Sequence, residues 1–299
     1  MKALKKNRKK ISKKLKRQKI SSAFYIAPSL IGVLFFFILP FLVVIFYSVV
    51  DNPISKNFVG LENFVKVIKN EAFRTAVKNT AMFSAVAVPL AVVLSLFLAM
   101  VLNSKMPFRS QFRTFFLSPL MVPVASIVLI WQVLFDYNGA VNEFLLSIGA
   151  DKIDWMKFEF SQLIVIILFL WKNLGYNMIL FMAALASVPH DMIEVASLEG
   201  ASSWQIFIHI KLRYMSSTIL FVTIMSLISS FKVFREVYLL TGDHPYPSIY
   251  LLQHFMNNAF ASLDYQRLSA AAILMSLVMI VLIGILFITE NHFGKDMEG

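Results

Sequence analysis

The sequence contains no cysteine among its 299 residues, and this absence excludes disulfide bonds, thiolate catalysis and cysteine-based zinc sites. Charge is scarce as well. Asp, Glu, Lys and Arg make up 15% of the chain, against about 25% in soluble domains. Hydrophobic residues reach 58%, and the mean hydropathy is +0.72. The composition therefore excludes an ordinary soluble domain and indicates a membrane protein.

Sequence motifs for nucleotide binding and hydrolysis are absent too. The chain has no G-x-x-x-x-G-K-[ST] loop, no H-E-x-x-H pair and no G-x-S-x-G elbow. Its five histidines show no metal-ligand spacing. We therefore expect no enzyme, no bound cofactor and no metal, although a membrane enzyme stays open as an alternative. Any uphill transport would draw its energy from a partner or from an ion gradient.

Positive charge is concentrated in residues 1–20, which hold 11 of the 28 Lys and Arg residues. A basic tail can bind nucleic acid, but beside an apolar run it is more typical of an anchor at the anionic cytoplasmic lipid face. We therefore expect a lipid partner and no nucleic acid. The apolar run that follows is longer than the core of a signal peptide and lacks a small-x-small cleavage site, so it predicts an uncleaved first helix.

Six apolar stretches are long enough to cross a hydrocarbon core of ~30 Å. The predicted spans cover residues 22–50, 79–104, 114–136, 160–188, 214–240 and 268–289. The fold class is thus all-α: a polytopic membrane protein with six transmembrane helices over residues 22–292. The predicted ends are a basic cytoplasmic tail, residues 1–21, and a cytoplasmic C-terminus, residues 293–299. The basic tail decides this orientation, since Lys and Arg are otherwise shared about evenly between the two sides.

The polar segment between the fourth and fifth spans, Pro189 to Tyr214, has a helical start signal and several small residues. Pro189 suits the first turn of a helix, where its missing N–H would be unpaired anyway. Gly200 disfavours a helix interior, so we predict two short helical pieces that meet at a tight bend. With the N-terminus inside, this segment faces the cytoplasm. An ordinary polar loop with a turn at Glu199–Gly200 is the alternative.

Charged residues inside predicted spans are functional candidates by default. Lys172 lies in the fourth span, and Lys232, Arg235 and Glu236 lie near the outer end of the fifth. An alternative gives Lys232 and Arg235 no special role: they snorkel to the outer interface, and Glu236 pairs with Lys232 four residues away.

The loop resembles the cytoplasmic EAA loop in the membrane subunits of binding-protein-dependent ABC importers. The matching positions are Glu194, Ala196, Gly200, Ala201, Trp204, Phe207, Ile210 and Leu212. Outer segments match the same family, among them Phe58 to Phe64 (FVGLENF) and Leu239 to Gly242 (LLTG). The resemblance extends over nearly the whole chain and is strongest for the carbohydrate branch, of the maltose and multiple-sugar type.

The resemblance implies the type I ABC importer permease fold and four kinds of partner. These are a second permease subunit, two cytoplasmic ATPases that hold ATP and Mg, an external solute-binding protein and the bilayer. Residues 189–213 would form the coupling loop, and the residues that would dock on the ATPase are Glu194, Ala196, Glu199, Gly200 and Ala201. Val195, Glu199 and Arg213 depart from the usual Ala, Asp and Pro of the family.

In related sugar permeases the fourth and fifth spans line the substrate pathway. The candidates at those positions are Asn173, Tyr176, Ser226 and Ser230, together with Lys172 and Lys232. Aromatic faces stack on sugar rings, and amides and hydroxyls bind their OH groups, but small polar residues also pack membrane helices. The lysines suggest an acidic saccharide. Two alternatives stay open: a permease of this fold for glycerol phosphate or another small solute, and a self-sufficient secondary transporter.

Overall fold

The computed structural model describes residues 25–104, 106–155, 157, 160–243 and 245–294. The predicted basic tail, residues 1–21, lies outside the described residues, as do residues 295–299 of the predicted C-terminus. In the described ranges the chain is helical, and the extended pairing is confined to an isolated bridge between Val50 and Phe58.

Six helical stretches are long and apolar enough to cross a membrane, which confirms the all-α, six-span prediction. They are Tyr25–Ser48, Glu71–Asn103, Val124–Ser147, Ser161–Ala186, Ser216–Thr241 and Tyr265–Glu290. The elements within and between them run α2 (Leu39–Ser48), α3 (Glu62–Lys69), α4 (Glu71–Asn103), α5 (Arg109–Met121), α6 (Val124–Phe135), α7 (Ala140–Ser147), α8 (Ser161–Ala186), α9 (His190–Leu198), α10 (Ser203–Ile206), α11 (Leu212–Tyr214), α12 (Ser216–Phe231), α13 (Phe234–Thr241), α14 (Leu252–Ala261) and α15 (Tyr265–Gly294).

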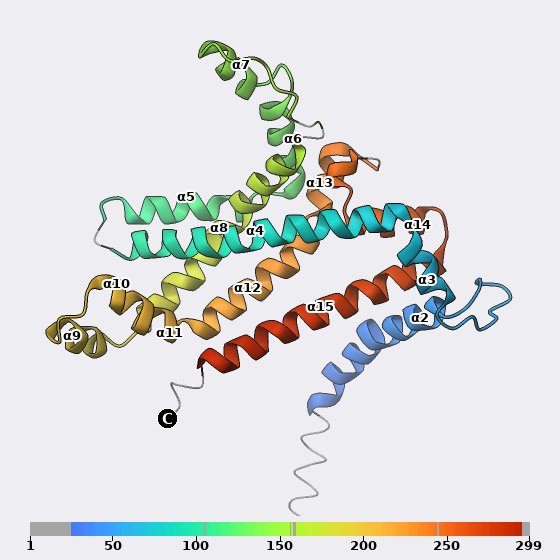
Figure 1. Ribbon diagram of the computed structural model, residues 1–299, viewed down its shortest axis with the longest axis horizontal. Helices are drawn as coiled ribbons and strands as arrows, with labels where there is room; N and C mark the ends of the chain where they lie inside the picture. Colours follow the sequence, from blue (N-terminus) through green and yellow to red (C-terminus); the bar gives the residue numbers. More distant parts are fainter. Residues whose placement is uncertain (1–24, 105, 156, 158–159, 244, 295–299) are drawn as a thin grey trace, which may run out of the picture.

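Figure 1 shows α4, α12 and α15 running side by side, with α8 crossing behind α4. The short helices α9 and α10 lie at one end of this bundle, and α3 and α14 lie at the other. Helix α6 packs on α8, and α7 lies beyond it, away from the bundle. The segment between the fourth and fifth spans is therefore displayed at one end, separate from the bundle's core.

Proline residues have different effects in different spans. Pro89 lies inside α4, which continues without interruption from Glu71 to Asn103. Pro123 instead ends a helix, because the residue before a proline avoids helical dihedrals. Val122 has φ −92° and ψ 131°, and the chain is divided there into α5 and α6. The run expected as one third span, residues 114–136, is thus two helices with a break.

The core forms where α4 packs on α8 and α12. Ala87 and Ala91 of α4 are fully buried, and small residues of this kind let membrane helices approach closely. The rings of Phe83 and Phe169 meet edge to face with centroids 5.5 Å apart. Between α4 and α12, the hydroxyls of Ser84 and Ser230 are 2.8 Å apart. These contacts fix α8 and α12, the two helices that hold the pathway candidates.

Candidate functional site: the inner loop and the α8–α13 face

The inner loop has the predicted form of two helical pieces joined by a tight bend. Helix α9 ends at Leu198, and Gly200 has a left-handed φ of +86°. The Gly200 N–H donates to the Ser197 carbonyl at 3.2 Å, and the Ala201 N–H donates to the Ala196 carbonyl at 2.9 Å. This pair of bonds is the Schellman arrangement, in which a glycine closes a helix. The expected bend is confirmed and lies at Gly200.

Helix α10 begins directly after the bend with a capping box. The Ser202 hydroxyl accepts from the Gln205 N–H at 3.3 Å, and the Ser202 N–H donates to Gln205 Oε1 at 2.8 Å. Both ends of the bend are therefore satisfied by the loop's own atoms. The bend needs no contact with the rest of the chain to keep its shape.

Four of the five predicted docking residues lie together around one shallow hollow. Ala196, Glu199, Gly200 and Ala201 line a cavity of about 390 Å³ whose other wall comes from the α10 side. Glu194 is exposed on α9 and does not line this hollow. Helix α9 has no fully buried residue, and only Ile193 and Ala196 are half-buried by the described chain.

The pathway candidates divide into two groups by burial. Ser226 and Ser230 are buried in helix contacts: Asn177 Nδ2 donates to Ser226 Oγ at 2.9 Å, and Ser230 bonds to Ser84. Helix packing accounts for these contacts. Asn173 and Lys172 are half-buried and Lys232 is exposed, and the three line one cavity between α8 and the α12–α13 junction; Tyr176 is exposed one turn along α8.

One expected ion pair is wrong. Glu236 does not pair with Lys232 four residues away; its Oε1 accepts from Lys172 Nζ on α8. The cause is a break in the fifth span, where α12 ends at Phe231 and α13 begins at Phe234. Because the helix does not continue through Lys232 and Val233, the i,i+4 geometry that would bring Lys232 to Glu236 is lost.

Comparisons with known proteins decide the family. Residues 91–299 match the model of the binding-protein-dependent transport system inner membrane component. The chain belongs to this family.

Relatives of the permease extend over almost its full length. The lactose transport system permease protein LacF of Rhizobium radiobacter is 27% identical over 92% of this chain and 94% of the relative. The trehalose/maltose transport system permease protein MalF of Thermococcus litoralis is 29% identical, covering 91% and 93%. A crystal structure of a bacterial alginate ABC transporter, in complex with a pentasaccharide-bound periplasmic protein, contains a similar chain. Its TM-score is 0.81 at 23% identity, covering 95% of the permease and 98% of that chain.

Family membership makes the permease a multi-pass membrane protein of a binding-protein-dependent importer and confirms the resemblance read from the loop. Because the family consists of components of binding-protein-dependent transport systems, the alternative of a self-sufficient secondary transporter is not supported. The ABC importer permease fold, expected from the sequence, is confirmed by the structural match.

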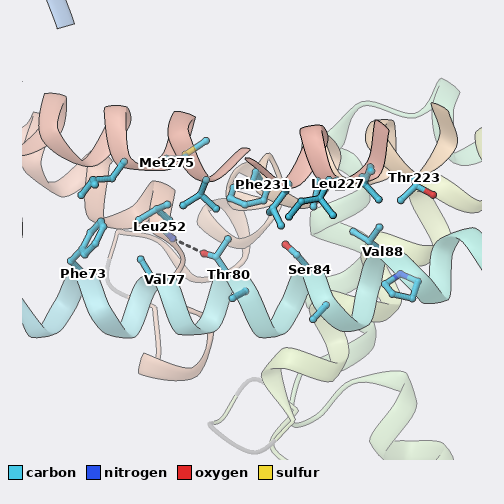
Figure 2. A pocket seen from close by; sticks show the side chains of 18 of the residues that line it. Phe73, Val77, Thr80, Ser84, Val88, Thr223, Leu227, Phe231, Leu252 and Met275 are labelled. Carbon is cyan, nitrogen blue, oxygen red and sulfur yellow. Dashed lines mark hydrogen bonds between the residues drawn. The ribbon is translucent and has the colours of Figure 1, made fainter. Parts of the chain in front are cut away.

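The permease also has an apolar groove of about 530 Å³ between α4, α12, α14 and α15 (Figure 2). Its polar groups are hydroxyls, and Thr80 uses its own to accept from the Leu252 N–H at 2.9 Å. Among the described residues, no charged or amide side chain lines it. Since a saccharide needs several polar partners, this groove fits lipid-like or helical surfaces better than a sugar.

Sequence reasoning did not identify the exposed apolar surface of the loop or the role of Asn177. Leu198 is 88% exposed at the end of α9, and Trp204 is exposed on α10. Large apolar side chains in a polar loop were a usable signal for an interaction surface. Asn177, which holds Ser226, carried no signal beyond being an amide in an apolar run.

Proposed function

We propose that the permease forms half of the translocation pathway of an ABC importer for a carbohydrate and is driven by a cytoplasmic ATPase through residues 189–213. The observation that carries this proposal is the α9–α10 loop, a folded element with no buried residue in α9 and an apolar tip at Leu198. An ordered helix with an exposed apolar surface is the form in which a helix docks into a groove. Glu194 and Glu199 would lie at the rim of that groove.

The chemistry of ATP belongs to the partner in this proposal. The permease sequence has no phosphate-cradling loop, so ATP and Mg would be held by the two ATPase subunits. When these subunits close around ATP, α9 moves with the groove that holds it. The α10–α11 segment joins α9 to α12, so this movement would be passed to the fifth span and alternate the pathway between its two sides.

The substrate class follows from the relatives and from the α8 face. LacF and MalF are named for lactose and for trehalose and maltose. Tyr176 offers an exposed aromatic face and Asn173 an amide, the two kinds of group that bind sugar rings and hydroxyls. A second permease subunit would supply the other wall, and an external solute-binding protein would deliver the sugar.

The orientation in this proposal places the N- and C-termini in the cytoplasm, because the basic tail of residues 1–20 favours that side. The α9–α10 loop then faces the ATPases. Helices α3 and α14, at the opposite end of the bundle, face the solute-binding protein (Figure 1).

The test uses the complete transporter, reconstituted in proteoliposomes with its binding protein, and measures ATP hydrolysis and uptake of labelled lactose and maltose together. We expect Leu198→Asp to leave the complex inserted but to reduce uptake per ATP hydrolysed by about tenfold, since a buried apolar contact becomes a buried charge. Ile148→Asp makes the same change at a side chain 63% exposed after α7 and should leave coupling unchanged.

Two variants at Gly200 separate the bend from the docking. Gly200→Asn tolerates a left-handed φ and adds a small side chain, whereas Gly200→Trp adds bulk at the same position. We expect Gly200→Trp to uncouple ATP hydrolysis from uptake and Gly200→Asn to retain most of it. Uptake by this chain reconstituted alone, or normal coupling in both Leu198→Asp and Gly200→Trp, would refute the proposal.

A further inference from the structure

Four charged side chains of the described residues line the cavity between α8 and the α12–α13 junction. Lys172 lies near the middle of α8 and pairs with Glu236 of α13. The Glu236 side chain is 6% exposed and that of Lys172 is 28% exposed. Glu236 Oε2 is buried and has no hydrogen-bond partner among the described residues. Lys172 therefore engages one oxygen of the single carboxylate, and neither Lys232 nor Arg235 uses the other in the described chain.

Two further cations line the same cavity and are not compensated. Lys232 lies at the turn after α12, and Arg235 lies in the first turn of α13. Neither forms a salt bridge within the part of the chain that the structure describes. The cavity, of about 140 Å³, is thus lined by three cations and one carboxylate, a formal excess of two positive charges.

An excess of positive charge within a membrane span restricts what this face can meet. A charged side chain in contact with lipid tails is expensive, so intramembrane charges face a water-filled path or a partner group of opposite charge. Lys232 and Arg235 are exposed in the isolated chain. A neutral sugar needs hydrogen-bonding groups and gains little from two unpaired cations. A carboxylate would complement the charge of both, and the Arg235 guanidinium could bind it through two parallel hydrogen bonds.

We propose that Lys232 and Arg235, beside the Lys172–Glu236 pair, form a subsite for the carboxylate of an acidic saccharide, such as a uronic acid residue of an oligosaccharide. The inference rests on the proposed function and adds the charge of its substrate. Tyr176, four residues after Lys172 on the same face of α8, would stack on the ring of a neighbouring sugar residue. Glu236 holds Lys172 toward α13 and leaves the other two cations to the solute.

The test compares three labelled solutes in proteoliposomes that contain the complete transporter and its binding protein. These are tri-galacturonate, the matched neutral trisaccharide of galactose, and glycerol 3-phosphate. The variant Lys232→Gln/Arg235→Gln removes both free cations while keeping hydrogen-bonding side chains. We expect uptake of tri-galacturonate by the wild type and a loss of about tenfold or more in the variant, because charge-assisted hydrogen bonds are lost.

A matched control removes the same charge elsewhere. Lys152→Gln/Lys157→Gln eliminates two cations between α7 and α8 that do not line the cavity, and tri-galacturonate uptake should be unchanged. Reversing the charge should have a larger effect than removing it, because two carboxylates would repel the substrate. Lys232→Glu/Arg235→Glu should therefore abolish tri-galacturonate uptake completely.

Four outcomes overturn the inference. Uptake of the neutral trisaccharide alone, with no effect of the cation variants, would leave the proposed function standing and remove the acidic substrate. Uptake of glycerol 3-phosphate alone would replace the saccharide class. Equal loss of all solutes in the Gln variant, with weaker co-purification of the second permease, would assign the two cations to a carboxylate of that partner. Transport of none of the three solutes by a wild type that takes up lactose or maltose would remove this inference and leave the proposed function standing.

Discussion

Gly175 of α8 lies directly against the backbone carbonyl of Phe116 in α5. A Cβ built on Gly175 would overlap the Phe116 carbonyl oxygen and crowd the Leu117 nitrogen at 3.2 Å. The two helices therefore approach at a distance that only a residue without a side chain permits. This contact fixes the first half of the divided third span against the helix that holds the pathway candidates.

Gly175→Ala should destabilise the permease by about 1–3 kcal/mol, the usual cost of overpacking a close helix contact. The atoms that an alanine Cβ would meet are backbone atoms of Phe116 and Leu117, so no flexible side chain can move aside to make room. The midpoint of thermal unfolding in detergent measures the change.

Gly284→Ala provides the matched control on α15. A Cβ at Gly284 meets nothing within 4 Å, and alanine is favoured over glycine in a helix interior. This variant should be neutral or slightly more stable than the wild type. Equal effects of the two substitutions would show that the α5–α8 contact is not constrained as described.

The expected spans and the observed helices differ most at Pro123, where the run expected as one span is divided. The number of spans was predictable because it depends on long uncharged runs, and these need only be read along the chain. Whether Pro89 and Pro123 interrupt their helices was not, since this depends on neighbouring helices that re-satisfy the backbone. The division of the third span at Val122–Pro123 is therefore a tertiary result.

Asn142 should be essential for the folded shape of the segment from Tyr137 to Trp155. Its buried amide donates to the Tyr137 and Ile153 carbonyls at 3.0 and 2.8 Å and accepts from Trp155 Nε1 at 3.0 Å. Asn142→Leu keeps the approximate volume and leaves these groups unpaired, at a cost of about 1–3 kcal/mol for each buried group. Faster tryptic cleavage after Lys152 in the variant is the expected result.

The exposed Asn138 of the same segment serves as the control. Asn138→Ala removes an amide that contacts Lys152 at the surface, and cleavage should change little. If Asn142→Leu resists trypsin as well as the wild type, other contacts hold the segment together.

His254 should make the stability of the permease depend on pH. Burial lowers the pKa of His254 from 6.5 to about 4, and its neutral Nδ1 accepts from the Leu251 N–H at 3.1 Å. The unfolded chain therefore binds a proton between pH 6.5 and 4 that the folded protein does not. The stability is complete above pH 6.5 and falls progressively as the pH decreases toward 4, which thermal unfolding at pH 7.5 and pH 5 would measure.

His254→Asn retains an acceptor for the Leu251 N–H and removes the titrating ring. Its unfolding midpoint should differ less between the two pH values than that of the wild type, even though the lost ring lowers stability overall. His209→Asn, at an exposed position, should keep the wild-type difference. A wild-type difference that survives in His254→Asn would assign the effect to another group.

Lys172 and Glu236 should show strong coupling in a double-mutant cycle. Lys172→Met leaves Glu236 buried without a cation, and loss of one partner of a buried pair costs on the order of 3 kcal/mol. Adding Glu236→Gln should recover much of that loss, because the buried charge is then gone. The free energies of unfolding of the four proteins, titrated in mixed detergent, give the coupling; simple additivity would mean that the pair contributes no mutual stabilisation.

The site was predictable where its geometry is local. Pro189, Gly200 and the small residues around it define a helix, a stop and a bend within a few residues, and the structure has this form. The partner of Glu236 was not predictable, because it depends on the break after Phe231 and on Lys172, 64 residues away. The Ser226 contact with Asn177 likewise joins two helices that the sequence alone does not align.

The bend at Gly200 is closed entirely by hydrogen bonds of its own segment, and a Cβ there would meet no neighbour within 4 Å. The left-handed backbone conformation of Gly200 therefore favours glycine in the chain itself, independently of any contact with another protein. A surface that is already shaped loses little conformational entropy when it associates. In each transport cycle the α9–α10 loop would then pass on the movement of its partner with little free energy lost to ordering the loop.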